Sequence, residues 1–133
     1  MSIEIHMLAW AVVLGIVQLV LASTTMTAQR GTKWNASARD GTPAPLTGVA
    51  ARLERALRNF LETFAFFAAA VLAVVLTQRA DAHTALGAQL YFWARVAYVP
   101  LYAAGIPYIR SLVWLVSMVG VVMVLWPLLA GAG

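Results

Sequence analysis

The sequence predicts an all-α integral membrane protein, a bundle of four transmembrane helices that run up and down across the bilayer. The chain of 133 residues is 62% hydrophobic and only 11% charged, whereas soluble domains carry about 25% charged residues. Its mean hydropathy is +0.83. Four apolar runs are long enough to span about 30 Å of hydrocarbon. We therefore expect a single membrane domain over residues 1–133, with membrane lipids as partners of its surface.

The first two helices are expected at about residues 6–27 and 46–78. Glu4 and His6 stand at the start of the first run where a signal peptide would carry basic residues, so we expect a retained helix. The second run is longer than a bilayer requires. Its basic N-terminal turns are therefore expected to project beyond the membrane.

The third and fourth helices are expected at about residues 83–103 and 107–130. Arg95 lies within the third run, and Pro107 opens the fourth at a first-turn position, which suits proline. Both are joined to their predecessors by short connections, and short connections make consecutive helices antiparallel neighbours.

A polar, turn-rich segment at about residues 28–45 separates the first two helices. The distribution of the basic residues predicts on which side of the membrane this segment lies. In this topology only Arg79 falls on the opposite side of the membrane. Positive loops face the cytoplasm, so we expect the long loop there and both termini on the far side, in the inner membrane if the source is bacterial. The basic residues on the loop side are Arg30, Lys33, Arg39, Arg52, Arg55, Arg58 and Arg110.

Several chemistries find no support in the sequence. The chain has no cysteine, so thiol chemistry would have to use a thiol brought by a ligand. His6 and His83 lie at the far side without carboxylates at ligand spacing, and we expect no metal site. The net charge of +4 is explained by topology, and we expect no nucleic-acid partner.

Polar residues in the second and third helices form two stripes. Arg55, Asn59 and Glu62 follow an i, i+4, i+7 spacing, which places them on one helical face. Glu62 lies at least one turn inside an apolar segment, where a carboxylate is costly unless it meets a cation, water or a polar ligand. On the third helix Arg95 belongs to a similar stripe with Tyr91, Tyr98 and Tyr102.

Two interpretations of these stripes remain open. Glu62 could pair with Arg95 and simply hold two helices together. Alternatively, the arginines serve an anionic ligand, because one pair would neutralise Glu62 and still leave a surplus of guanidinium groups, which bind carboxylates in bidentate fashion. The residues concerned are Arg55, Arg58, Arg95 and Arg110, with Ser111 following the last of them.

The motif formed by Arg55, Asn59 and Glu62 resembles the signature of the membrane-associated proteins in eicosanoid and glutathione metabolism, the MAPEG family. The family includes the microsomal glutathione transferases and the microsomal prostaglandin E synthase. Arg58 before Asn59 and Thr63 after Glu62 are most similar to the prostaglandin E synthase form of the motif. The third-helix set and the Arg110–Ser111 pair match in the same order. The resemblance covers essentially the whole chain, and the chain looks like a bacterial-type member of the family.

This resemblance implies a homotrimer of four-helix bundles, with glutathione bound between adjacent subunits. Arg110, assisted by Ser111, would stabilise the glutathione thiolate. The residues that would hold the tripeptide are Arg30, Arg55, Arg58, Asn59, Glu62, Arg95, Tyr98 and Tyr102.

The expected function is that of a glutathione-dependent transferase or peroxidase-like enzyme. Its co-substrate would be a lipophilic small molecule dissolved in the bilayer, attacked by the activated thiolate. A non-catalytic protein that binds lipid or presents a partner on the same scaffold is the alternative.

Overall fold

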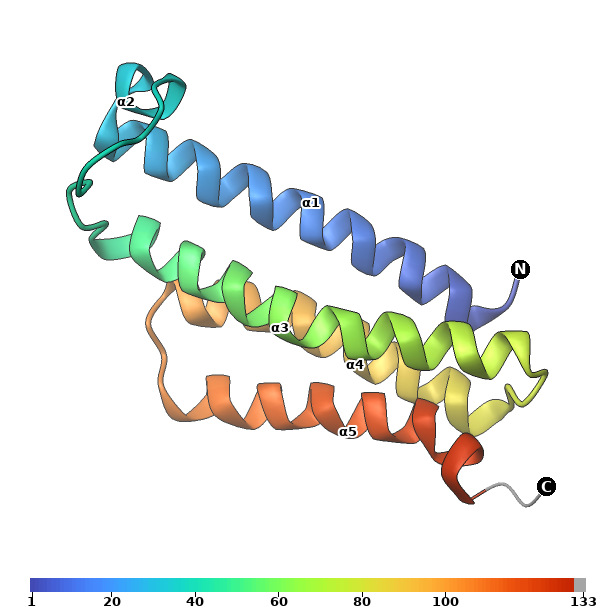
Figure 1. Ribbon diagram of the computed structural model, residues 1–133. Coiled ribbons are helices and arrows are strands. Elements are labelled where there is room, and N and C mark those ends of the chain that lie inside the picture. The colour runs from blue at the N-terminus through green and yellow to red at the C-terminus, as the bar shows by residue number, and fades with distance from the viewer. Residues whose placement is uncertain (131–133) are drawn as a thin grey trace.

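The computed structural model describes residues 1–130, which form four long helices and one short one (Figure 1). In chain order these are α1 (Ile3–Arg30), α2 (Thr32–Ala36), α3 (Gly48–Leu76), α4 (Ala82–Ala103) and α5 (Tyr108–Ala130). The long helices lie side by side, and both chain ends emerge at the end of the bundle away from α2. No strand occurs in residues 1–130, which confirms the all-helical class.

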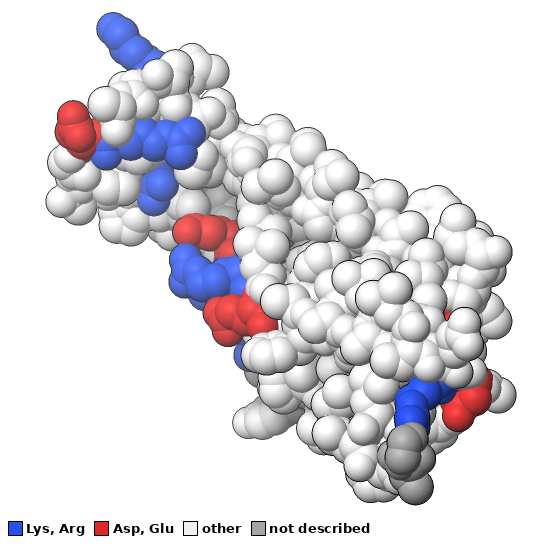
Figure 2. Space-filling model, turned by 45° about the vertical axis from the view of Figure 1, so that its right-hand side comes forward, with Lys and Arg blue, Asp and Glu red and all other residues white. Residues whose placement is uncertain are grey.

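Three of the long helices are long and apolar enough to cross a membrane. These are α1, α3 and α5, with 28, 29 and 23 residues and mean hydropathies of 2.2, 2.0 and 2.4 in their most apolar windows. Helix α4 has 22 residues, about 33 Å at 1.5 Å per residue, yet its polar stripe keeps it outside this class. Figure 2 shows charged side chains near the two ends of the visible face and in one further cluster along its edge, while the rest of that face is uncharged.

The loop between α1 and α3 is more ordered than the sequence suggests. We expected an irregular segment over residues 28–45, whereas α1 continues to Arg30 and α2 lies within the segment. The guanidinium groups of Arg30 and Arg39 lie 5.3 and 5.6 Å from the Trp34 ring centroid. A five-residue helix is too short to show a hydrophobic period, and cation–π contacts made across the loop leave no local sequence signal.

Two side chains at the end of α1 close this loop. The Gln29 amide donates to the Thr47 carbonyl over 2.9 Å and accepts from the Thr47 N–H over 3.1 Å. Arg30 Nε donates to the Ala44 carbonyl over 2.9 Å. The start of α3 is thereby fixed beside the end of α1.

The polar helix α4 supplies much of the buried core. Tyr91 is fully buried, stacks on Phe67 with ring centroids 4.0 Å apart, and shares a hydrogen bond of 3.1 Å with the Thr63 hydroxyl. Where α4 crosses α5, a Cβ atom at Gly87 would lie 2.7 Å from the Gly120 carbonyl oxygen. These two glycines allow the backbones to approach closely, as small residues do between membrane helices.

Hydrogen bonds fasten both ends of α4 to its neighbours. At its start, Asp81 caps the helix, and the Thr84 hydroxyl donates to the buried Glu4 carboxylate of α1 over 2.6 Å. At its end, Arg52 of α3 donates to the Ala103 carbonyl over 2.8 Å, satisfying one of the free carbonyls of a helix terminus. The polar stripe of α4 is thus held in fixed register with α3.

Candidate functional site

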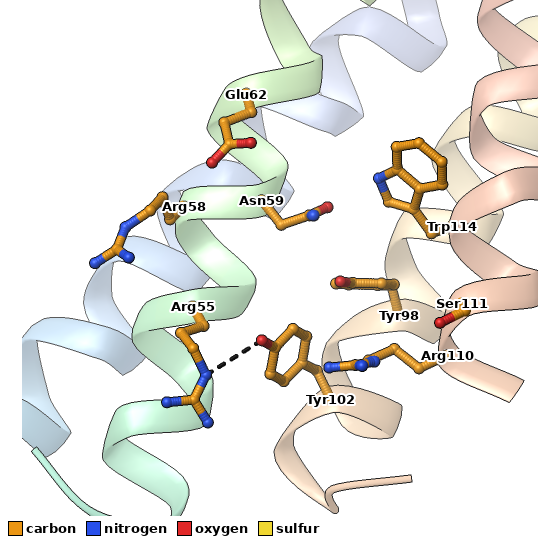
Figure 3. Close-up of a pocket in the computed structure, with 9 residues that line it drawn as sticks. All are labelled: Arg55, Arg58, Asn59, Glu62, Tyr98, Tyr102, Arg110, Ser111 and Trp114. Carbon is orange, nitrogen blue, oxygen red and sulfur yellow. Dashed lines mark hydrogen bonds between the residues drawn. The ribbon is translucent and has the colours of Figure 1, made fainter. Parts of the chain in front are cut away.

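A cavity of about 400 Å³ opens between α3, α4 and α5 at the loop end of the bundle (Figure 3). A volume of this size is typical of small-molecule sites. Eight of the ten site residues predicted from the sequence line it, together with one that was not predicted. The lining residues are Arg55, Arg58, Asn59, Glu62, Tyr98, Tyr102, Arg110, Ser111 and Trp114.

Helix α3 contributes Arg55, Arg58, Asn59 and Glu62 to the lining. In Figure 3, Asn59 points toward α4 and α5, whereas Arg58 and Glu62 point away from them, at the open edge of the cavity. Arg58 forms an ion pair of 3.1 Å with Glu54, one turn earlier, and the two side chains are 64% and 44% exposed. An exposed pair of this kind contributes little stability, so Arg58 remains free to exchange Glu54 for a ligand. Glu62 is also exposed, although the helix around it is apolar.

Tyr102 of α4 lies between two arginines that come from different helices (Figure 3). Arg55 Nε donates to the Tyr102 hydroxyl over 3.2 Å, and the guanidinium carbon of Arg110 lies 4.5 Å from the Tyr102 ring centroid. The ring therefore attracts both cations while keeping them apart. Their remaining donors are available to an anion in the cavity.

Arg95 lies behind the cavity wall and not in it. Its side chain is 1% exposed, Nη1 donates to Asn59 Oδ1 over 2.9 Å, and the guanidinium lies 4.3 Å from the Tyr98 ring centroid. Arginine can only donate, so this bond fixes Oδ1 as the atom of Asn59 that faces Arg95. The Asn59 amide N–H groups are left for the cavity.

The structure does not contain the Glu62–Arg95 pair that was one of the two interpretations. The only hydrogen-bond partner of Arg95 within residues 1–130 is Asn59, and its Nε and Nη2 atoms are buried without partners. The periodicity placed Arg95 on the correct stripe of α4, but it could not show that Asn59 would stand between this residue and the cavity.

Arg30 is the second predicted site residue, after Arg95, that does not line this cavity. Its side chain contacts Ala44 and Trp34 in the loop, and it is absent from the lining. Within one chain Arg30 orders the loop.

Trp114 lines the cavity and was missed in the sequence. It stands four residues after Arg110 and three after Ser111, so all three lie on one face of α5. The four-residue spacing from Arg110 could have identified Trp114 as a site residue from the sequence. Its Nε1 atom is buried without a hydrogen-bond partner within residues 1–130.

The fold and the cavity define a membrane-embedded helical bundle with an arginine-rich site at its loop end. The model of the MAPEG family matches residues 7–130, and the chain therefore belongs to the MAPEG family. It is accordingly an integral membrane protein of a family concerned with glutathione-related transfer and eicosanoid metabolism. Neither the curated proteins nor the solved structures contain a significant match.

Proposed function

We propose that this protein is a glutathione-dependent membrane transferase or peroxidase-like enzyme. It binds glutathione in the α3–α4–α5 cavity and directs the thiolate at a lipophilic electrophile from the bilayer. The observation that carries the proposal is the presence of Arg55, Arg58 and Arg110 in the lining of one cavity, together with a single carboxylate, Glu62.

The charges of the cavity suit glutathione. Three arginines and one glutamate in the lining leave a net charge of +2. Glutathione carries two carboxylates, one ammonium group and a thiol. Arginines bind carboxylates as bidentate donors, and Glu62 would accept from the ammonium group.

Arg110 is the residue best placed to stabilise the thiolate. It is the third residue of α5, where free N–H groups and the helix dipole already favour an anion. An ordinary thiol has a pKa of about 8.5, and neighbouring cations lower it. Ser111 would donate one further hydrogen bond, and the nucleophile would come from the ligand because the chain has no cysteine.

A homotrimer is part of the proposal because the cavity is open on the side of α3. Exposed Glu62 lies in a helix whose most apolar window has a mean hydropathy of 2.0, and polar groups in lipid require burial or a partner. An adjacent subunit would cover this side and could bring its own Arg30 to the ligand. Glutathione would enter from the cytoplasm, on the side of the long loop.

Reconstituted vesicles containing the purified protein test the proposal. Glutathione and a lipophilic electrophile or hydroperoxide are added, and the conjugate or reduced product is measured by mass spectrometry. We expect turnover by the wild type and by Lys33→Ala, a change in the exposed loop, and strong loss in Arg55→Ala. Absence of both products from the wild type at millimolar glutathione would favour the non-catalytic lipid-binding alternative.

A further inference from the structure

Trp114 is the α5 residue of the cavity lining that lies farthest from the loop end of the bundle. It lies one turn beyond Arg110 on α5, toward the middle of the helix. In Figure 3 the indole nitrogen of Trp114 points from α5 toward the space that faces α3. This nitrogen is buried and has no hydrogen-bond partner among residues 1–130.

One turn further along α3 and α5 lies a second cavity, which is apolar. Phe66 follows Glu62 by four residues on α3, and Met118 follows Trp114 by four on α5. Both line this second cavity, which has a volume of about 440 Å³ and whose other lining residues are alanine, valine and leucine. Within residues 1–130 the Trp114 N–H has no acceptor, and no polar side chain lines the second cavity. An oxygen of an occupant can therefore supply the acceptor.

We propose that Trp114 forms the electrophile subsite and donates its indole N–H to an oxygen of the electrophile. The inference rests on the proposed function. The arginines that suit the carboxylates of glutathione lie nearer the long loop, whereas Trp114 lies one turn before Met118, which lines the apolar cavity that suits a lipid-soluble molecule. The substrate class is therefore an apolar compound with a carbonyl group conjugated to the carbon that is attacked, such as a long-chain α,β-unsaturated ketone.

The chemistry of this subsite is an addition. The glutathione thiol loses its proton to water at the cytoplasmic mouth, and the thiolate forms a C–S bond to the β-carbon. The C=C electron pair moves toward the carbonyl and gives an enolate, whose oxygen accepts from Trp114 Nε1. Water then returns a proton to the α-carbon, so the product is the saturated thioether. A donor aimed at an oxygen that gains charge acts mainly in the transition state.

Trp114→Phe tests this inference because phenylalanine keeps an aromatic ring and removes the N–H group. The enzyme in vesicles is given glutathione with either a long-chain alkyl vinyl ketone or a primary alkyl iodide of the same length. Iodide displacement creates no oxyanion. We expect kcat/KM for the ketone to fall at least tenfold and that for the iodide to change less than threefold.

Trp126→Phe is the matched control, because Trp126 is on the same helix and 55% exposed. It should leave both rates unchanged. If the wild type turns over both compounds and Trp114→Phe lowers both equally, or lowers neither, the inference is wrong while the proposed function stands. If the wild type conjugates neither compound and binds no glutathione in calorimetry, the proposed function and the inference both fall.

A measurement on the wild type keeps the inference testable if Trp114→Phe does not fold. The five tryptophans are labelled with ¹⁵N, and the protein is saturated with glutathione. A saturated long-chain ketone should shift one indole N–H resonance downfield, and an alkane of equal length should not. Identical spectra with the two compounds would overturn the inference.

Discussion

At the scale of single residues, the site depends on Arg55, Arg95 and Arg110, three cations that form no ion pair within residues 1–130, whereas Arg58 pairs with Glu54. Arg95 is fully enclosed between α3 and α4, with one amide oxygen and two aromatic rings as its neighbours. Arg110 and Arg55 share the ring and hydroxyl of Tyr102. Aromatic rings attract cations without neutralising them, so the positive potential of the cavity is preserved for an incoming anion.

Arg110→Ala should separate binding from activation. The ends of the tripeptide would still be held by the α3 residues, so the glutathione affinity should change little. The ultraviolet absorbance of the bound thiolate should disappear, and the conjugation rate should fall by roughly one hundredfold or more, as for a group that stabilises charge in a dry site. An Arg110→Ala variant that keeps both the absorbance and the rate would reduce Arg110 to a headgroup anchor.

Arg95→Met should weaken glutathione binding although Arg95 does not line the cavity. Its loss would free the Asn59 amide to rotate, and we expect the Kd for glutathione to rise about tenfold, or about 1.4 kcal/mol. Arg95 is a buried charge with no acidic partner within residues 1–130. Burying such a charge is costly, so its replacement by methionine should not lower the melting temperature. A double-mutant cycle with Asn59→Ala provides the check, and additive effects of the two changes would contradict the positioning role.

At the scale of elements, the close crossing of α4 and α5 sets the width of the cavity. The two helices bear the cavity residues Tyr98, Tyr102 and Arg110 at the loop end, and they touch through Gly87 and Gly120 nearer the other end. A Cβ atom at Gly120 would lie 2.5 Å from the Gly87 carbonyl oxygen and 2.7 Å from the Tyr91 backbone nitrogen. Such an overlap can be relieved only by moving one helix.

Gly120→Ala should therefore destabilise the bundle even though alanine favours helix formation. Overpacking of this kind typically costs about 1–3 kcal/mol, which should appear as a lower melting temperature in detergent and as weaker glutathione binding. Gly15→Ala is the comparison, because the three atoms nearest to a Cβ there all belong to the Phe60 ring, the closest at 3.0 Å, and none is a backbone atom. It should lower the melting temperature less. Equal melting temperatures for the wild type and Gly120→Ala would show that the crossing is not tight.

The elements also show what the sequence could and could not predict. Long apolar runs define α1, α3 and α5, and the helical spacing brought eight predicted residues to one cavity. The sequence could not show α2, because a single turn stabilised by Arg30 and Arg39 has no period. Nor could spacing along one helix reveal that Asn59 separates Arg95 from the cavity, because that depends on the depth of packing between two helices.

At the scale of the whole molecule, one bundle leaves polar side chains of the site uncovered. The face of α3 that carries Arg55, Arg58 and Glu62 is exposed, and Arg30 is engaged in the loop of its own chain. Membrane proteins cover such polar surface with other helices. A symmetric trimer would do this for all three copies at once.

Native mass spectrometry in mild detergent should therefore show a homotrimer. Arg79→Ala, at the opposite end of the bundle, is the control for unspecific loss of association and should preserve the assembly. A spectrum that contains monomer alone, under conditions in which the helical content is retained, would contradict an intersubunit site.

Calorimetric titration of the purified protein with glutathione tests the central claim most directly. The cavity geometry predicts saturable binding by the wild type at no more than millimolar concentration, and an affinity at least tenfold lower in Arg55→Ala, because a guanidinium that meets a carboxylate is lost. Binding that persists unchanged in Arg55→Ala, or a wild-type protein that gives neither heat nor a thermal shift at millimolar glutathione, would contradict the assignment of this cavity as a glutathione site.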